Sequence, residues 1–370
     1  MIRDSFLKRY FIIAGDPSGD SHGALLIREI RKIEPQSHFY GIGGSAMLAE
    51  GFDSIIPQSS VSVVGFWEVL KKYSFFKNLL NRCQSILRND KPDAFIPIDY
   101  PGFNIRMAKY AKSINIPVIY YIAPQLWAWG KDRAKQLVGN VDKLLTVFPF
   151  ETEFFARFGI NTDFVGHPLL DNPDFENISQ LERENKLAFF PGSREQEVVK
   201  HLKLFTNILQ ETRLQNEFQI SVAKAKNVPN TVYDSFASQF QNIEFESDSA
   251  NLLRTAKAGF IKTGTSNLEA CLAELPFAMY YKTSIVSYLI AKNLVNLEHI
   301  SIVNILTKRN TIREFVQNDI EPKAVAKHLR QLMTDDAQRK AMIDEFREIR
   351  SYLGGPGASN RAAKIISEFR

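Results

Sequence analysis

Cysteine is scarce in this sequence of 370 residues, and long apolar runs are missing from it. Cys83 and Cys271 are its only cysteines, and they stand far apart in apolar surroundings. Two such residues provide neither a disulfide framework nor a metal site, so we expect buried thiols in a reducing compartment. The apolar stretch near the start ends at Asp16, and no run reaches the roughly 18 residues of a membrane span. The sequence therefore predicts a cytoplasmic protein.

A large charge excess is also lacking. Lys and Arg number 46 against 41 Asp and Glu, which gives a net charge of +5. A mild positive excess suits an anionic partner, namely a phosphorylated substrate, an anionic membrane face or nucleic acid. Because the sequence has no basic tail and no nucleic-acid-binding motif, nucleic acid ranks last and we expect none. No cluster of His, Cys and Asp has the spacing of metal ligands, so we expect no metal either.

Short apolar runs alternate with helix-like stretches along the whole chain. Runs such as YFIIAG and PVIYYIA are typical of buried strands, and HGALLIREIRKI has helical periodicity. This alternation predicts an α/β fold whose parallel sheets are covered on both faces. A polar stretch at residues 172–186 interrupts the pattern, which then starts again.

We therefore predict two doubly wound, Rossmann-like domains facing a cleft, since 370 residues exceed the size of one usual core. The first domain would span residues 1–171 and the second residues 172–350. Residues 351–370 would form a C-terminal helix that can return to the first domain after the break LGGPG. Ligands of such sheets bind beyond the carboxyl ends of the strands.

The first polar motif is FIIAGDPSGDSHGA, residues 11–24. It predicts a strand that ends at Gly15, a tight turn over Asp16 to Asp20, and a helix that begins near Ser21 or His22. The turn either positions a polar substrate or is only a capped connection.

The second polar motif is IPIDYPGFN, in which Asp99 ends a strand between apolar neighbours. Burying a carboxylate is costly unless it is hydrogen-bonded, paired or used. Asp99 is therefore either a general base for an acceptor hydroxyl or a cap for a helix that begins at Phe103. The spacing fits the cap poorly, which favours the base.

The second domain carries two glycine turns at strand ends. In FFPGSREQEV, Ser193 can cap a helix and Arg194 projects beside its N-terminus, which suits a phosphate or diphosphate. The alternative is that Arg194 pairs with Glu195 or Glu197. In IKTGTSNLEACLAELP, a hydroxyl-rich turn precedes a helix with Glu269, which could accept hydrogen bonds from a ribose. Two such turns favour a nucleotide-sugar site.

Together these motifs resemble those of one family. AGDPSGD, YGIGG, SVVGFWEVLK, IDYPGFN, APQLWAW, FPFE, VGHPL, FPGSRxxE, TGTSNLE and NIL…REFVQ run in family order over nearly the whole chain. The family is lipid-A-disaccharide synthase, a glycosyltransferase family of bacterial lipid A assembly. APQLWAW, and PGSR together with TGTSNLE, are the specific motifs. The resemblance implies the GT-B fold, with the acceptor side first and the nucleotide-sugar side second.

The resemblance also implies a reaction. UDP-2,3-diacylglucosamine would be joined to 2,3-diacylglucosamine 1-phosphate (lipid X), giving lipid A disaccharide 1-phosphate and UDP, with inversion and without a metal or cofactor. An inverting transfer needs a base for the acceptor hydroxyl and charge stabilisation on the departing UDP. Arg194 and helix N-termini can supply the charge stabilisation on UDP. Whether the chain forms a homodimer is left open.

The resemblance implies candidate site residues at the positions of this sequence that match the motifs of the family. The catalytic candidates are Asp99 and, next, Asp16. The acceptor-side candidates are Ser18, Asp20, Gln125 and Trp127. The nucleotide-sugar candidates are Ser193, Arg194, Thr265, Ser266, Glu269, Asn304, Glu314 and Gln317.

Three positions depart from the family pattern. Asp16 stands where glutamate is common, Gly102 where a second acid often stands, and Gly130 where an arginine often follows WAW. The first two changes put the reach of Asp16 in doubt and leave Asp99 as the only acid of its motif. The third can alter how the acceptor phosphate is held.

Residues 61–80 combine an apolar stripe at helical spacing with aromatics that fall off the stripe. The stripe is expected to pack on the sheet, whereas Trp67 and Phe75 fall near two lysines. Exposed aromatics beside lysines are typical of interfacial membrane contacts. We therefore predict peripheral association with the cytoplasmic face of the inner membrane, with Val64, Phe66, Trp67 and Phe75 contacting the membrane or the acyl chains.

Three other functions compete with this interpretation. Another GT-B enzyme, such as a UDP-sugar epimerase, would bind a UDP-sugar but need no lipid acceptor. A non-catalytic nucleotide-sugar-binding protein would show no turnover. A dehydrogenase is disfavoured because YGIGG is an incomplete dinucleotide fingerprint on the second predicted strand.

Overall fold

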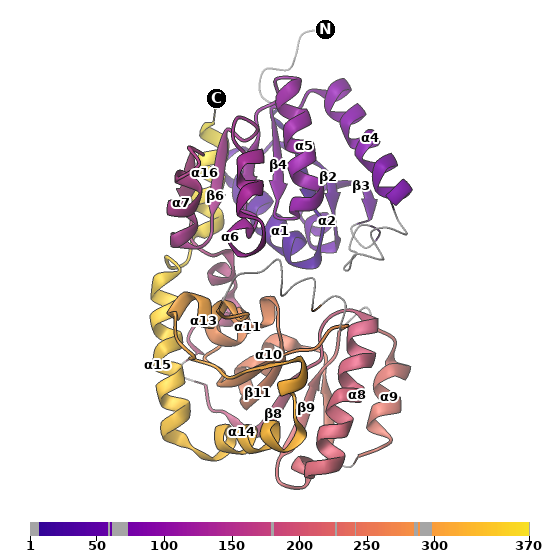
Figure 1. Ribbon diagram of the computed structural model, residues 1–370. Coiled ribbons are helices and arrows are strands. Elements are labelled where there is room, and N and C mark those ends of the chain that lie inside the picture. The colour runs from indigo at the N-terminus through magenta and orange to yellow at the C-terminus, as the bar shows by residue number, and fades with distance from the viewer. Residues whose placement is uncertain are drawn as a thin grey trace. The chain divides into compact units, whose positions relative to one another are not determined.

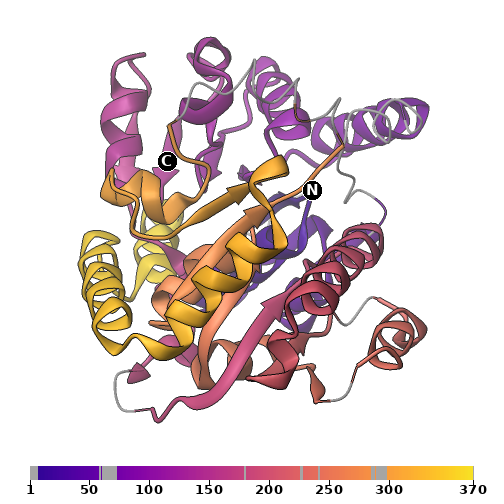
Figure 2. The same cartoon turned by 60° about the horizontal axis from the view of Figure 1, so that its bottom comes forward.

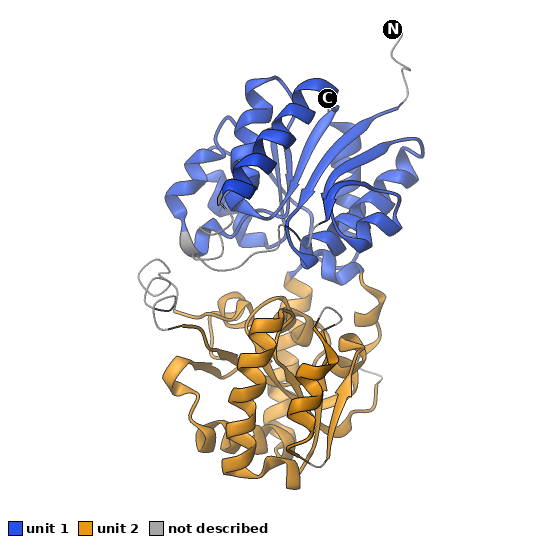
Figure 3. Cartoon of the chain, turned by 90° about the vertical axis from the view of Figure 1, so that its right-hand side faces the viewer, with its two compact units in different colours: residues 1–171, 286–296, 353–370 blue, residues 172–285, 297–352 orange. Residues whose placement is uncertain are grey.

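The computed structural model describes residues 7–57, 60, 73–178, 181–225, 228–240, 242–284, 288 and 298–369. They form two compact units (Figure 3). Unit 1 holds the chain up to Asp171 and again from Leu353 onward, and unit 2 is built from residues between Asn172 and Tyr352.

Unit 1 is built on a sheet whose strands β2, β3, β4 and β6 are labelled in Figure 1. The sheet is parallel, and its seven described strands have the order β3-β2-β1-β4-β5-β6-β7. The strands are β1 (Arg9–Ala14), β2 (His38–Gly43), β3 (Asp53–Pro57), β4 (Ala94–Ile98), β5 (Ile119–Tyr121), β6 (Lys143–Thr146) and β7 (Thr162–Phe164).

Both faces of this sheet are buried. Successive side chains of a strand point to opposite faces, and β1 shows the division. Phe11 and Ile13 belong to one buried cluster, whereas Tyr10 and Ile12 belong to another. This double burial explains why the strand sequences are continuously apolar and do not alternate with polar residues.

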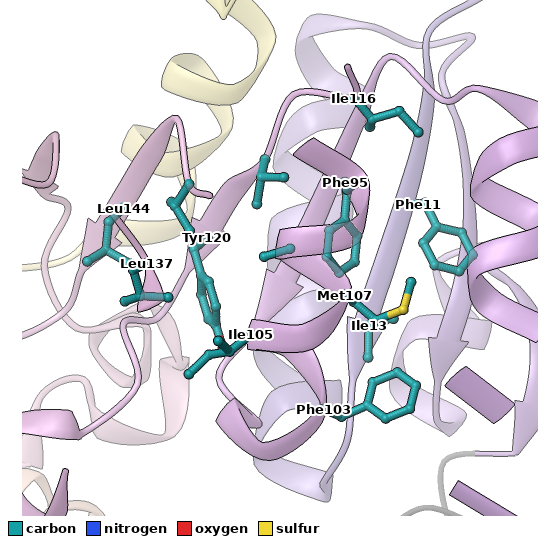
Figure 4. Close-up of a cluster of buried hydrophobic side chains, with 14 of the residues drawn as sticks. Phe11, Ile13, Phe95, Phe103, Ile105, Met107, Ile116, Tyr120, Leu137 and Leu144 are labelled. Atoms are coloured by element: carbon teal, nitrogen blue, oxygen red, sulfur yellow. The ribbon is translucent and has the colours of Figure 1, made fainter. Parts of the chain in front are cut away.

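Helices cover each face. Helices α4 (Tyr73–Asp90) and α5 (Pro101–Ser113) cover the first cluster, and Phe103 and Met107 of α5 pack there with Phe11 and Phe95 (Figure 4). Helices α1 (Pro17–Ile33) and α16 (Ala358–Glu368) cover the second. The shorter elements are α2 (Ser45–Ala49), α6 (Leu126–Trp129), α7 (Pro149–Ala156), η2 (Lys131–Gln136) and η3 (Pro168–Asp171).

Helix α16 joins unit 1 although it follows all of unit 2 in sequence. It packs beside α1, and its Ile366 is buried in the second cluster. The Asp171 carboxylate accepts hydrogen bonds from the backbone N–H groups of Gly357, Ala358 and Ser359, at 2.6, 3.1 and 2.7 Å. These are donors that the first turn of a helix cannot satisfy itself. Asp171 therefore fixes the point at which the chain returns.

Unit 2 repeats the architecture, with six described strands in the order β10-β9-β8-β11-β12-β13. The strands are β8 (Glu184–Phe190), β9 (Gln219–Ala223), β10 (Ile243–Glu246), β11 (Ala256–Lys262), β12 (Phe277–Tyr281) and β13 (Glu314–Val316). The helices are α8 (Glu195–Thr212), α9 (Asn230–Ala237), α10 (Ser249–Thr255), α11 (Thr265–Leu272), α13 (Ile302–Thr307), α14 (Pro322–Thr334) and α15 (Asp336–Tyr352).

Aromatic rings fill the core of unit 2. Phe189 of β8 stacks on Phe205 of α8 with centroids 4.0 Å apart, and both lie near Phe260 of β11. Helix α14 crosses the same sheet and packs on β11 and β12 (Figure 2). The predicted α/β fold with two doubly wound parallel sheets is confirmed.

Two further observations concern the whole described chain. Cys83 and Cys271 are both buried and unpaired. Of the helices in the described ranges, none has the length and apolar character to cross a membrane.

Candidate active site

The sequence-predicted residues of unit 1 lie where its parallel strands end. Parallel strands bring their carboxyl ends to one edge of the sheet, where ligands of such folds bind. The loops after β1, β4 and β5 carry Asp16, Asp99 and Gln125, and α6 carries Trp127. Trp127 is buried and Gln125 is exposed.

Asp99 sits on a strained turn. Asp99 has φ of 41° and the next residue, Tyr100, has φ of 52°, both in the left-handed region. Such backbone in non-glycine residues costs on the order of 1–3 kcal/mol each and gathers at functional sites. The carbonyl of Asp99 accepts hydrogen bonds from the Tyr120 hydroxyl at 2.6 Å and from Asn104 Nδ2 at 2.8 Å. These two side chains hold the strained turn in place.

The Asp99 carboxylate does not cap α5. That helix begins at Pro101 after the N-cap residue Tyr100, and no side-chain cap is formed. Burial raises the pKa of Asp99 to about 7, the Asp16 carboxylate adds to the rise, and a hydrogen bond from the Tyr100 backbone opposes it. A general base works best when its pKa lies near the operating pH.

Asp16 begins α1 instead of standing in a separate turn. Its Oδ1 accepts the backbone N–H of Gly19 at 2.7 Å, and Pro17 is the first helical residue. The predicted start near Ser21 or His22 is therefore wrong by about one turn. Proline fits the first helical position because the N–H that it lacks would have no partner there.

The two loops meet at Gly15. A Cβ at Gly15 would lie 2.2 Å from Cγ of the Tyr100 ring, so the ring rests directly on the glycine. Any side chain at position 15 would displace Tyr100 and with it the neighbouring Asp99. At Gly102, on the other side of Asp99, a Cβ would meet no atom within 4 Å.

We expect Gly15→Ala to lower activity by at least about tenfold, because misplacing a catalytic group by about 1 Å can cost about 10²-fold. Gly102→Ala is the matched control and should leave activity within about twofold of the native value. Steady-state rates and thermal unfolding of both variants provide the measurement. Equal activities would show that the contact between Gly15 and Tyr100 does not position Asp99.

Asp20 has a structural task. Its buried carboxylate accepts hydrogen bonds from the backbone N–H groups of Gly44, Ala46 and Met47, at 2.8, 3.0 and 3.0 Å. It thus caps α2 and holds the YGIGG turn, a structural role that the sequence-based prediction of acceptor binding did not include. Ser18 Oγ lies 3.3 Å from Nε2 of His22.

Sequence reasoning gave no role to Glu151 of the FPFE motif. Its buried carboxylate accepts hydrogen bonds from Trp127 Nε1 at 3.0 Å and from the backbone N–H groups of Val147 and Phe148. Burial raises the pKa of Glu151 to about 7, although these hydrogen bonds lower it. Glu151 therefore fixes the APQLWAW segment to the loop after β6.

A buried histidine pair was also missed. The rings of His22 and His167, the latter from VGHPL, lie edge to face with centroids 6.1 Å apart. Burial lowers the pKa of His22 to about 4 and that of His167 well below its usual range, so both are neutral at pH 7. Backbone N–H of Leu169 donates to Nδ1 of His167.

Of the predicted membrane-contact residues, only Phe75 can be placed. Val64, Phe66 and Trp67 lie outside the described residues. Phe75 is partly buried, packs against the first cluster of unit 1 and meets Phe76 edge to face. The expectation that Phe75 falls away from the packed face of its helix is therefore wrong.

In unit 2, the PGSR turn follows β8. Gly192 has φ of 111°, and the N-cap residue of α8 is Arg194, without a side-chain cap. The predicted cap by Ser193 is therefore wrong, because the chain stays extended for one more residue; Ser193 is exposed. Arg194 Nη1 lies 3.2 Å from Glu197 Oε1, as the alternative interpretation predicts.

The second glycine turn of unit 2 follows β11. Gly264 has φ of 146°, and a Cβ there would meet no atom within 4 Å, so the backbone is open to a ligand. Thr265 is exposed and Ser266 partly buried. Burial raises the pKa of Glu269, whereas a hydrogen bond with Ser266 lowers it.

The side chains of Asn304 and Glu314 are hydrogen-bonded to each other. Asn304 Nδ2 donates to Glu314 Oε1 at 2.9 Å, and the same carboxylate accepts the backbone N–H groups of Ile300 and Ser301. They therefore brace the entry to α13. Gln317 is different, because its buried Nε2 has no hydrogen-bond partner in the described structure.

Within the described ranges, no group of three or more His, Cys, Asp or Glu side chains is placed to hold a metal ion. Taken separately, unit 1 carries the candidate carboxylates Asp16 and Asp99 after β1 and β4, and unit 2 carries Arg194 at the glycine turn after β8.

Comparison with known proteins decides the assignment. The model of the lipid-A-disaccharide synthetase family matches residues 10–369. The chain belongs to the lipid-A-disaccharide synthase family. Two members of this family are the lipid-A-disaccharide synthases of Trichlorobacter lovleyi, 33% identical with 97% of each chain covered, and Syntrophus aciditrophicus, 34% identical with 96% of each covered.

Membership of the lipid-A-disaccharide synthase family confirms the predicted activity: the chain is a glycosyltransferase of lipid A biosynthesis. Solved structures agree on the fold. The S. aureus MnaA-UDP co-structure has a TM-score of 0.65 at 11% identity, covering 98% of this chain and 96% of that one. Acinetobacter baumannii MurG has a TM-score of 0.58 at 11% identity, covering 98% and 100%. The GT-B fold is thereby confirmed.

Proposed function

We propose that this enzyme joins UDP-2,3-diacylglucosamine to lipid X and that Asp99 is its general base. The acceptor hydroxyl oxygen forms a bond to the anomeric carbon while the bond from that carbon to UDP breaks. The hydroxyl proton passes to Asp99, and UDP leaves. The observation that carries the proposal is the Asp99 turn, a strained strand end whose carboxyl has a pKa raised by burial to about 7.

Unit 2 supplies the nucleotide-sugar side in this proposal. Arg194 and the N-terminus of α8 bear positive charge at the end of β8, where a diphosphate can be held without a metal. The open turn at Gly264 lets a ligand approach the backbone of α11, with Thr265 and Ser266 as hydroxyl contacts. Gln317 offers to the same ligand its Nε2, which has no hydrogen-bond partner among the described residues.

Mass analysis of the products tests the proposal. Enzyme with UDP-2,3-diacylglucosamine and lipid X should form lipid A disaccharide 1-phosphate and UDP. A UDP-sugar isomer formed without lipid X would indicate an epimerase and contradict the proposal. UDP-sugar binding without any turnover would indicate a non-catalytic binding protein and would contradict it as well.

We also propose that residues 61–72 meet the cytoplasmic face of the inner membrane. The proposal rests on the sequence pattern, in which Trp67 falls outside the expected packing stripe near Lys71 and Lys72, and Val64 precedes the expected helix. Acylated substrates also need an apolar surface when they leave a bilayer.

The double variant Val64→Ser, Trp67→Ser should lose binding to liposomes containing anionic lipid and activity on long-chain substrates. UDP affinity and thermal stability should remain native. Phe75 is left unchanged because it packs on the core. Co-sedimentation with liposomes and kinetics on short-chain and long-chain substrates provide the measurement, and native values in both would contradict the membrane proposal.

A further inference from the structure

Lys262 is a residue to which neither the motifs nor the family assignment gave a role. It is the last residue of β11, and the preceding residue, Ile261, pairs with Phe190 at the end of β8. The side chain of Lys262 therefore reaches the PGSR turn from the neighbouring strand. Its Cδ lies 3.7 Å from the position that a Cβ would take at Gly192.

One carboxylate holds two cations at this turn. Lys262 Nζ lies 3.2 and 3.3 Å from the two oxygens of Glu197, and Arg194 Nη1 lies 3.2 Å from Oε1 of the same group. Glu197 Oε2 would lie 2.8 Å from a Cβ at Gly192. The three charged groups therefore converge on one glycine whose φ is positive, and their net charge is +1.

The other lysines beside this turn have different partners. Lys282 Nζ donates to the carbonyl of Gln317 at 2.9 Å, and Lys200 Nζ donates to the carbonyl of Lys282. Arg194 and Lys262, by contrast, are balanced by a carboxylate that is about one-fifth exposed. A ligand with two or more negative charges can compete with one carboxylate for both cations.

We propose that Lys262 is a second diphosphate-binding residue beside Arg194. In this proposal Glu197 is a positioning residue, and its ion pairs with Arg194 and Lys262 are replaced by ion pairs with the diphosphate when the ligand binds. This inference rests on the proposed function, because it assumes that a UDP-sugar binds at the PGSR turn. Glu197 keeps the two side chains extended toward Gly192 while no ligand is bound. Lys262 then adds a second positive charge where the departing UDP gains negative charge.

The first test compares binding of UDP and of uridine to the full chain by calorimetry. Lys262→Met should weaken UDP binding by about 10- to 100-fold, the range of one hydrogen bond to a charged group. Uridine lacks the diphosphate, so its affinity should stay native. Lys262→Arg keeps the charge and should retain most of the UDP affinity.

Lys186→Met is the matched control. Lys186 forms a 2.7 Å ion pair with Glu184 on β8 and is similarly buried, but it lies on the strand before the glycine turn. This variant should bind UDP with native affinity. Thermal unfolding of each variant separates lost binding from lost folding.

Glu197→Gln tests the positioning residue. Removing the competing charge should strengthen UDP binding several-fold, whereas kcat should fall because the two cations lose their orientation. A role in stability alone would lower the melting temperature and leave the UDP affinity and kcat unchanged, and that result would overturn the part assigned to Glu197.

Failure of the inference can be told apart from failure of the proposed function. If the native enzyme does not bind UDP, the proposed function itself is wrong. If the native enzyme binds UDP and Lys262→Met binds it equally well, the proposed function stands and the role of Lys262 is overturned.

Discussion

Replacing Asp99 with asparagine should lower turnover by about 10²–10⁴-fold, the usual loss on removal of a general base. UDP binding should be unchanged, because Asp99 and the PGSR turn lie in different units. Initial rates and calorimetric UDP binding provide the measurement. Asp132→Asn, which alters an exposed carboxylate of unit 1, is the control and should retain full activity.

The pH dependence gives the same prediction a second readout. Only the ionised carboxylate can accept a proton, and burial raises the pKa of Asp99 to about 7. Activity should therefore fall as the pH drops below about 7. Asp99→Asn should lose this limb of the profile together with most of its rate.

The contribution of Asp99 to folding stability should have the opposite pH dependence to activity. The folded-state pKa of Asp99 is above the ordinary value of 3.8, so the native state binds more protons than the unfolded chain between 3.8 and about 7. Stability contributed by this group is lost as the pH rises through that window. Asp99→Asn should therefore be more stable than the native enzyme above pH 7.

The turnover of Asp99→Asn decides the role of the residue. A folded Asp99→Asn enzyme with near-native turnover would exclude Asp99 as the base and make Asp16 the next candidate.

Arg194→Ala should weaken UDP binding and slow transfer by about 10²–10³-fold, which is the usual loss when one preorganised charge-stabilising donor is removed. Arg194 stands at the N-cap of α8, so its guanidinium and the helix N-terminus act at the same place. Arg309→Ala is the control, since Arg309 is an exposed partner of Glu348 in the same unit. Steady-state kinetics and calorimetry with UDP compare the two variants.

EDTA adds an independent test of leaving-group stabilisation. If protein cations do the work of a divalent ion, the native enzyme keeps its activity in EDTA. Activity that disappears in EDTA and returns with magnesium would contradict the account given for Arg194.

The fold could be predicted because its signals are local. Continuous apolar strands such as β1 and β4 are buried on both faces, and this double burial requires an uninterrupted run of apolar residues that can be recognised in the sequence. Helix starts were less predictable, because they depend on one or two residues. Asp16 with Pro17 begins α1 about one turn earlier than predicted, and the extended backbone of Arg194 makes that residue, not Ser193, the N-cap of α8.

The site was only partly predictable, because several of its side chains are used by partners far away in sequence. Asp20 resembles a substrate ligand until its three donors after β2 are known. Glu151 is a carboxylate in an aromatic motif, and its bond to Trp127 joins two separate motifs. The motifs FPFE and VGHPL pointed to these places, but no local pattern distinguishes a buried Glu151 or His167 from a surface residue.

The return of α16 to unit 1 bears on the order in which the protein folds during synthesis. Ile366 fills a cluster with residues of β1 and β4, yet it is translated after the whole of unit 2. Until then, that apolar surface of unit 1 stays uncovered and exposed to aggregation. Unit 1 can therefore complete its core only after the whole of unit 2 has been synthesised, which departs from the usual order in which N-terminal units of nascent chains fold first.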